Sequence, residues 1–231
     1  EGLILARRGL TAFVLRLLCT TTPGLLRLRL IDPAHAGDSF MELVGLGKHA
    51  VEARIGTESR QALRAEIGAV DEYIAEVKSQ YLGALYENLT AYNRVSGELA
   101  LPWQILAIAD FPYGWDKDAT DVLLHIARNG PRAGVHVAAI VDTSVALPHG
   151  VNLDEIKRLS VVLQQEHNGF RIKSDGFDGF RLKFDALPRP ADWLSAVIAR
   201  LNEAIEKSAD VVVPLDGYRP RNLWTKSAAR G

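Results

Sequence analysis

The sequence predicts an α/β domain in which a parallel sheet carries helices on both faces. Short apolar runs alternate with longer segments whose apolar residues recur every three or four positions. This is the pattern of strands alternating with amphipathic helices. The runs at 105–109 and 135–141 are apolar at almost every position, as strands of a doubly covered parallel sheet are. The chain has 231 residues, 48% of them hydrophobic, which is enough for one sizeable core.

The first elements are expected to be a strand and a helix. Residues 3–6 form a short apolar run that we interpret as a strand. The helix follows over 10–20, with apolar residues at 10, 13, 14, 17 and 18 on one face. Thr22-Pro23-Gly24 ends it. The next expected elements are a strand over 25–31, a short helix over 40–44 and a short strand over 51–55.

A long helix is expected over about 57–90, with Thr57 as its N-cap. Its apolar residues are spaced 4, 3, 4, 3 and 4 positions apart, at Leu63, Ile67, Val70, Ile74, Val77 and Tyr81. This spacing makes a heptad-like seam. One interpretation is a helix that lies across the sheet. The other is a protruding hairpin or a self-association surface, which would make the chain a protein-interaction module.

Two more strands complete the expected sheet. One runs from Pro102 to Asp110, and the other covers 135–141. Between them Asp116 is expected to cap a helix with apolar residues at 119, 122, 123, 126 and 127. Asn129-Gly130-Pro131 ends that helix.

After residue 148 the pattern changes. We expect residues 1–148 to form the α/β core, 149–213 to add a β-hairpin and a final helix to the same domain, and 214–231 to be a linker or tail. The hairpin is predicted from His167-Asn168-Gly169 between two apolar runs, because Asn-Gly favours a tight hairpin turn. The final helix is expected to begin at Pro190.

Composition excludes several classes of protein. The formal net charge of −1 gives no strong overall field toward nucleic acid or membrane. The single cysteine, Cys19, excludes an internal disulfide and a cysteine metal cluster, and favours a reducing compartment. No apolar run approaches the ~20 residues of a membrane span. We therefore expect a cytoplasmic location without direct membrane contact, and we interpret both ends as cuts from a longer protein.

The strand that ends at Asp110 carries a pattern with chemical meaning. Apolar residues lead to an acid at the carboxyl end of the strand, and Phe111 follows. Ligands of open α/β sheets bind beyond the carboxyl ends of the strands, where an acid can hold the Mg²⁺ that bridges nucleotide phosphates. This is the form of a Walker B strand. The alternative is that Asp110 pairs with a neighbouring side chain or caps a turn.

Several segments around this strand, in the same order, resemble the motor domains of the FtsK/SpoIIIE DNA-translocase family. They are Leu28 to Pro33, Tyr92-Asn93-Arg94, Leu101-Pro102, the strand ending at Asp110, and Asn129 to His136. The match is closest to the degenerate ATPase-like domain just upstream of the motor in some large members. Segments similar to Leu17 to Gly24, Ala109 to Pro112 and Leu223-Trp224 recur there. The resemblance covers roughly residues 3–225.

The resemblance implies a three-layer, RecA-like P-loop-ATPase-type sheet with a C-terminal hairpin and helix extension. It implies a structural or regulatory domain of a larger translocase that uses ATP and Mg²⁺ to move DNA or, as in related secretion ATPases, to engage protein substrates. The implied partners are an adjacent motor domain of the same polypeptide, further copies in a homo-oligomer, and DNA through the parent protein.

This sequence departs from the family's pattern in the segments that carry catalysis. A phosphate-binding loop needs Gly-x-x-x-x-Gly-Lys-Ser/Thr between the first strand and helix, where we place residues 7–11. The similar stretch at 45–49 follows a later strand, and we interpret it as a turn. Phe111 stands where an acid would orient the attacking water. We therefore expect a non-hydrolysing domain without a cofactor of its own. The alternative is an active ATP-binding motor domain whose phosphate loop is unobserved, with residues missing near Arg7, or is completed by a partner.

The candidate site residues follow from these patterns. By resemblance, Asp110, Arg132 and Thr143 are candidates for nucleotide binding, and Asp110 is the candidate metal ligand. The alternatives are a relic arginine at 132 and a self-capping loop at 142–144. Basic residues alternate with apolar ones on the hairpin strands, and a shared face would form a nucleic-acid-binding stripe of Arg171, Lys173, Arg181 and Lys183. The alternative is an ordinary solvated sheet face.

Overall fold

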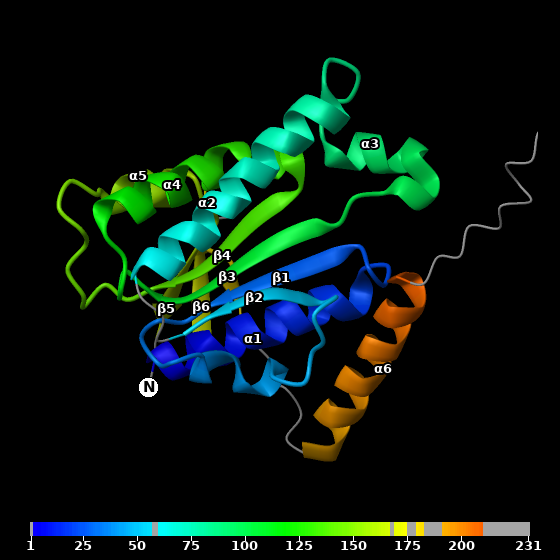
Figure 1. Ribbon diagram of the computed structural model, residues 1–231. Helices are drawn as coiled ribbons and strands as arrows, with labels where there is room; N and C mark the ends of the chain where they lie inside the picture. The colour runs from blue at the N-terminus through cyan, green and yellow to red at the C-terminus, as the bar shows by residue number, and fades with distance from the viewer. Residues whose placement is uncertain (1, 57–59, 167–168, 175–178, 183–190, 210–231) are drawn as a thin grey trace, which may run out of the picture.

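The computed structural model describes residues 2–56, 60–166, 169–174, 179–182 and 191–209. Within them a four-stranded sheet lies between two layers of helices (Figure 1). The strands are β1 (Leu26–Ile31), β2 (Val51–Ile55), β3 (Trp103–Phe111) and β4 (Val135–Val141). They are all parallel and lie in the order β2-β1-β3-β4. The predicted fold class, a three-layer α/β domain with a parallel sheet, is confirmed.

The sheet register brings the carboxyl ends of the strands together. Ile31 at the end of β1 is level with Ile108 in β3, and Val141 at the end of β4 is level with Phe111. Every residue of β3 after Trp103 is buried, so β3 is a central strand covered on both faces. Polar residues that follow β1, β3 and β4 therefore lie at one edge of the sheet.

One face of the sheet is covered by α1 (Gly2–Thr20) and α6 (Ala191–Ala209). The buried side of α1 carries Leu10, Val14 and Leu18. The strand expected over 3–6 is wrong, because these residues form the first turns of α1. A four-residue apolar run does not distinguish a strand from the start of a helix, and Gly9 lies buried inside the helix.

The other face is covered by α2 (Arg60–Glu76) and α4 (Lys117–Asn129). Five of the six residues of the heptad-like seam are at most 2% exposed and belong to the core, namely Leu63, Ile67, Val70, Ile74 and Val77. The interpretation as a helix lying across the sheet is confirmed, and this seam offers no self-association surface. The helix continues as a π-helical segment, Val77–Leu82, and ends there rather than near 90.

The N-cap of α4 agrees with the prediction from the sequence. The Asp116 carboxylate accepts a hydrogen bond from the Ala119 amide at 3.0 Å and caps α4, as expected. Asn88 caps α3 (Leu89–Ser96) in the same way. Thr57, the expected cap of α2, lies outside the described residues.

The C-terminal part contains β5 (Val162–Glu166), β6 (Gly169–Lys173) and β7 (Arg181–Leu182), which form an antiparallel sheet. The predicted hairpin is thus present, while its turn residues 167 and 168, Lys183, Pro190 and the tail from 214 lie outside the described residues. A short helix, α5 (Leu153–Arg158), was not predicted. The apolar side of α6 packs through Ile198 and Ile205 on the same cluster as α1.

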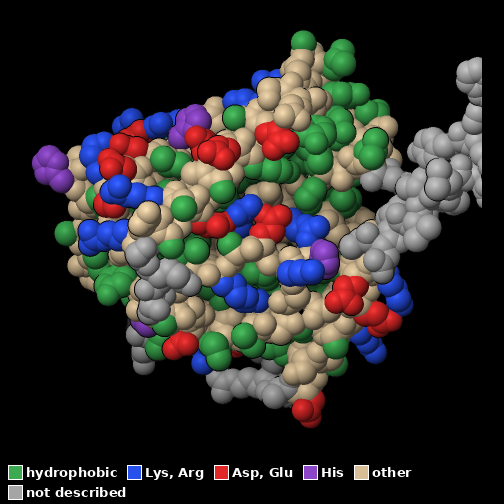
Figure 2. All heavy atoms as spheres, viewed as in Figure 1, with side chains coloured by type: hydrophobic (Ala, Val, Ile, Leu, Met, Phe, Trp, Pro, Cys, Tyr) green, Lys and Arg blue, Asp and Glu red, His purple; other side chains and the backbone are tan. Residues whose placement is uncertain are grey.

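The described residues include no candidate membrane span, and they expose an apolar region on the face seen in Figure 2. Among the described residues, no helix combines the length and apolar character needed to cross a bilayer. Hydrophobic side chains gather where α3 and the turn before it lie (Figure 2). There Leu85, Val95 and Leu99 are 86%, 67% and 74% exposed.

Candidate functional site

The candidate site lies at the carboxyl edge of the sheet. Asp32 directly follows β1, Asp110 is the second-last residue of β3, and Asp142 directly follows β4. Asp110 has a φ of +52°, a left-handed conformation that is uncommon outside glycine and costs backbone energy. The local register shift between Ile108 and Phe111 places this residue off the regular ladder.

Arg7 from α1 forms an ion pair with Asp110. Its Nη2 atom lies 2.6 Å from Asp110 Oδ2, and its Nε donates to the same oxygen at 2.9 Å. The side chains are 21% and 4% exposed, respectively. The other carboxylate oxygen, Oδ1, is buried and has no hydrogen-bond partner. The arginine therefore neutralises the acid of the Walker B-like strand from within the chain.

His35 completes the contacts of Asp110 Oδ2. Its Nδ1 lies 3.0 Å from that oxygen, and Arg7 Nη2 lies 3.3 Å from its Nε2. Because a guanidinium can only donate, Nε2 acts as the acceptor and Nδ1 carries the proton. Oδ2 thus accepts one hydrogen bond, from Arg7 Nε, and lies in close contact with Arg7 Nη2 and His35 Nδ1.

Asp32 is completely buried and organises the loop after β1. Its Oδ1 accepts from the His35 amide at 3.2 Å, and its Oδ2 accepts from the Ser39 amide at 2.9 Å. His35 Nδ1 lies 3.6 Å from Asp32 Oδ1. The loop between β1 and the 3-10 helix Asp38–Leu43 is therefore fixed by the Asp32 carboxylate at its base. This loop holds His35 over Asp110.

Phe111 and Asp142 flank the site. Phe111 is 2% exposed, and its ring packs edge-on against Trp115 with centroids 5.5 Å apart, so it belongs to the core. Asp142 accepts from the Ser144 hydroxyl at 2.6 Å and from the Ser144 amide at 2.9 Å. These bonds, together with the nearby charge of Arg7, hold the pKa of the Asp142 carboxyl below its usual value. Thr143 lies exposed in this turn.

The structure separates Arg132 from the other candidate residues. Arg132 precedes β4, at the amino edge of the sheet, and its Nε donates to the Glu87 carbonyl at 2.8 Å. Asp110 and Thr143 lie at the opposite, carboxyl edge. The three residues chosen for nucleotide binding therefore do not share one site.

The basic residues of the hairpin do share a face. Arg171 and Arg181 lie directly opposite each other across β6 and β7, and Lys173 follows two positions along β6, on the same face. Glu166 on β5 approaches both arginines, 2.5 Å from Arg171 Nε and 3.6 Å from Arg181 Nε. The hydrogen bond from Arg171, followed by the charges of all three basic residues, holds the pKa of Glu166 below its usual value. The positive stripe exists but is partly neutralised.

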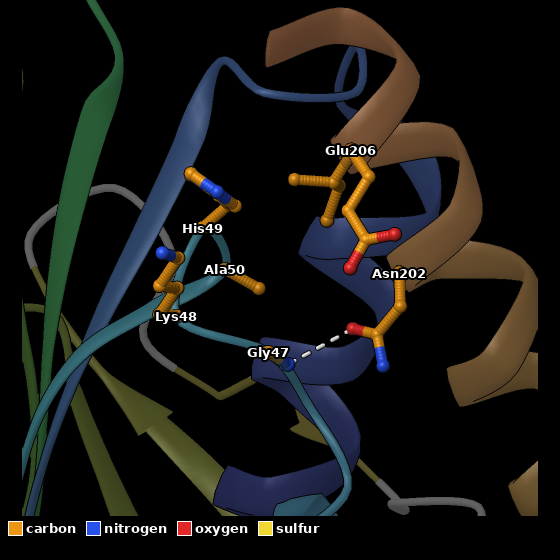
Figure 3. Close-up of a pocket in the computed structure, with 7 residues that line it drawn as sticks. Gly47, Lys48, His49, Ala50, Asn202 and Glu206 are labelled. Atoms are coloured by element: carbon orange, nitrogen blue, oxygen red, sulfur yellow. Dashed lines mark hydrogen bonds between the residues drawn. The ribbon is translucent and has the colours of Figure 1, made fainter. Parts of the chain in front are cut away.

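The loop at 45–49 is a turn held by α6, as interpreted from the sequence (Figure 3). Asn202 accepts from the Gly47 amide at 2.9 Å and donates to the Gly45 carbonyl at 2.8 Å. A cavity of about 270 Å³ lies between this turn and α6, bordered by Lys48, His49 and Glu206. It opens at the amino end of β2, away from Asp110.

Sequence reasoning missed Arg7 and His35 as parts of the site. Residues 7–11, placed at the phosphate-binding loop, lie in the middle of α1, so that placement is wrong. The lack of a Gly-Lys-Ser/Thr sequence there carries no information about such a loop. A detectable signal existed for Asp32, because acids that follow neighbouring parallel strands meet at one edge of the sheet.

Comparisons with known proteins bear on the fold. No family model matches the sequence, and no curated protein matches it. Among solved structures, EssC (ATPases 2 and 3) from Geobacillus thermodenitrificans aligns with a TM-score of 0.65 at 15% identity over 85% of this chain and 41% of that one. The cytoplasmic domain of the Thermomonospora curvata type VII secretion ATPase EccC aligns with a TM-score of 0.66 at 20% identity over 84% of this chain and 26% of that one.

A third similar structure is the pCW3 conjugation coupling protein TcpA, in its monomer form with ATPγS. It has a TM-score of 0.54 at 15% identity, over 81% of this chain and 58% of that one. The chain thus spans less than two thirds of each of these proteins. At such identities the likeness concerns the fold alone: a parallel α/β sheet covered by helices, similar to the ATPase domains of these proteins.

Proposed function

We propose that this chain is an ATPase-like domain of a larger FtsK/SpoIIIE-type protein and that it does not hydrolyse ATP itself. It acts as a structural or regulatory module beside an intact motor domain of the same polypeptide. The parent protein uses ATP and Mg²⁺ in the cytoplasm to move DNA or, as in secretion ATPases, to engage protein substrates. Subunit packing in a homo-oligomer and gating of the motor are the roles that such a module serves.

The observation that carries this proposal is the ion pair between Arg7 and Asp110. In a working site of this fold, the acid at the end of the strand faces the Mg²⁺ that accompanies the nucleotide. Here Asp110 Oδ2 already accepts a hydrogen bond from Arg7 Nε, and Arg7 Nη2 and His35 Nδ1 lie 2.6 and 3.0 Å from the same oxygen. The residues at this position therefore do not fit a Mg²⁺–nucleotide complex unless Arg7 moves away.

Phe111 supports the same proposal from the next position. Hydrolysis needs a group that orients the attacking water. The Phe111 side chain cannot accept a proton, and it is buried against Trp115 rather than directed to the carboxyl edge. Loss of the acid at this position removes hydrolysis even where a nucleotide binds.

A second candidate function is an active ATP-binding domain. The observation that favours it is the helical conformation of residues 7–11, because a phosphate-binding loop would precede α1 and would lie outside the sequence given. In this case Arg7 would leave Asp110 when nucleotide and Mg²⁺ arrive.

Isothermal titration of the parent polypeptide with ATP and Mg²⁺ separates the two candidates. The proposed function predicts that the Asp110→Ala variant binds the same number of nucleotides per chain, with unchanged affinity, as the natural protein. Asp121→Ala, which removes an exposed acid from α4, is a matched control. Loss of one micromolar nucleotide site in Asp110→Ala, but not in Asp121→Ala, would establish the active domain instead.

A further inference from the structure

Asp32, His35 and Asp110 form a cluster with the composition of a metal site. Each offers one ligand atom, and these atoms lie within 4.8 Å of one another. His35 Nδ1 lies 3.0 Å from Asp110 Oδ2 and 3.6 Å from Asp32 Oδ1. Ligand atoms bonded to one ion at ~2.1 Å lie about 3.0–3.5 Å apart. Two of the three separations are therefore close to those of metal ligands, and the third is at most 4.8 Å.

The charges of the cluster favour a cation. The side chains of Asp32 and Asp110 are 0% and 4% exposed. Among the described residues, Arg7 is the one guanidinium in an ion pair with either of them. Two buried carboxylates thus share a single positive charge, and burying an unpaired carboxylate is costly. A divalent ion would supply the missing positive charge.

One carboxylate oxygen of the cluster is left without a partner. Asp110 Oδ1 is buried and lacks a hydrogen-bond partner, although buried carboxylate oxygens are nearly always paired. The left-handed backbone of Asp110 holds this carboxylate in place at a cost in conformational energy, which structures commonly pay at binding sites. Arg7 contacts only Oδ2, which is also the oxygen 3.0 Å from His35 Nδ1. An ion therefore takes Oδ1 after a turn of the carboxylate, while the ion pair is kept, or shares Oδ2 with Arg7.

Access to the cluster is open on one side. The His35 side chain is 43% exposed. It borders a cavity of about 300 Å³ that Arg8, Thr11 and Ser39 also line. An ion can therefore approach the cluster from this cavity past the His35 ring, while the two carboxylates lie behind it.

We propose that Asp32, His35 and Asp110 bind one divalent transition-metal ion such as Zn²⁺. An imidazole with two carboxylates suits Zn²⁺ and its neighbours in the first row, whereas Mg²⁺ takes oxygen ligands and keeps most of its water. The site requires neither ATP nor a phosphate-binding loop, so it is independent of the proposed function. Binding requires His35 to carry its proton on Nε2 instead of Nδ1, and Arg7 then turns away from that nitrogen.

The arginine gives the proposal a directional test. A guanidinium beside the site repels the incoming ion, and it also holds His35 in the tautomer that does not bind metal. The Arg7→Gln variant should therefore bind Zn²⁺ more tightly than the natural chain, by about tenfold or more. A merely structural role for the cluster predicts no gain, because Arg7→Gln would only loosen it.

The test is titration calorimetry of the full chain with Zn²⁺, together with the visible absorption of bound Co²⁺. We expect one ion per chain, at least about tenfold weaker binding in His35→Asn, and unchanged binding in His125→Asn. His125 is the matched control, because it also pairs with an aspartate, Asp71, at 2.6 Å on an exposed surface. Since His35 is partly exposed, circular dichroism should show that His35→Asn keeps the fold.

Two results would overturn the proposal. One is the absence of a stoichiometric site in both the natural chain and Arg7→Gln. The other is a site that His35→Asn and His125→Asn weaken equally, which would identify surface histidines as the ligands.

Discussion

Removing Arg7 tests how strongly the carboxyl edge depends on its ion pair. In Arg7→Met the aliphatic part of the side chain is kept, while Asp110 Oδ2 loses the hydrogen bond from Nε at 2.9 Å and the charged contact with Nη2 at 2.6 Å. Truncating one partner of a fully buried pair costs about 3–5 kcal/mol, whereas a fully exposed pair contributes about 0–1 kcal/mol. Arg7 is 21% exposed and Asp110 4%, so this pair lies between the two limits.

We expect a loss of about 2 kcal/mol in the free energy of unfolding, because the exposure of the pair lies between these two limits. For a chain of this length that corresponds to a fall in melting temperature of about 4–8 °C. The measurement is urea denaturation of the natural chain, Arg7→Met, Asp110→Asn and the double variant. The double-mutant cycle should give a coupling energy of about 1.5 kcal/mol or more.

Arg64→Met is the matched control. Arg64 pairs with Asp116 at 2.7 Å, but the two side chains are 49% and 21% exposed, so its removal should cost at most about 1 kcal/mol. Equal losses in Arg7→Met and Arg64→Met, or additive effects of Arg7→Met and Asp110→Asn, would refute the reasoning about the buried pair.

Three further predictions concern other parts of the chain. Asn202→Ala removes both hydrogen bonds that hold the turn at 45–49. It should lower the free energy of unfolding by about 1–2 kcal/mol and speed hydrogen exchange in that turn. Exchange that stays slow in the variant would contradict the role of Asn202. The hydrogen bond from Arg64, then that from the Ala119 amide, holds the pKa of Asp116 below its usual value. This carboxylate therefore stabilises the fold above its usual pKa, and the stabilisation disappears as the pH falls through the lowered pKa. NMR titration should show the carboxyl titrating at a higher pH in Arg64→Met, and an unchanged titration would exclude Arg64 as the cause. If the hairpin face contacts DNA, Arg171→Gln should weaken binding to a short duplex and reduce the slope of log affinity against log salt concentration by about one. Glu166→Gln should strengthen the same binding. Fluorescence anisotropy that is unchanged in both variants would rule out this contact.

The periodic parts of the fold were predictable because buried apolar residues recur at regular intervals along the sequence. The doubly apolar strand β3, the seam of α2 and the Asp116 cap of α4 each follow from a local rule, and the structure agrees with each. The start of α1 was not predictable in this way. Its apolar first turn resembles a strand, and only packing against the sheet decides between them.

The candidate site was predictable only in part. Asp110 was found because an acid ends an apolar strand. Its partners come from positions 103 and 75 residues away in the chain, Arg7 and His35, and neither belongs to a local motif. Tertiary packing of α1 on the sheet brings Arg7 to the acid, and the loop organised by Asp32 brings His35. Charge pairing over such separations leaves no periodic signal in one sequence.

The most direct test of the central claim is a crystal structure of the parent polypeptide with Mg²⁺ and ATPγS. Our account predicts that Arg7 Nη2 stays within hydrogen-bond distance of Asp110 Oδ2, at about the 2.6 Å found here, and that no nucleotide lies at this carboxyl edge. A Mg²⁺–nucleotide complex on Asp110 with Arg7 displaced would contradict it.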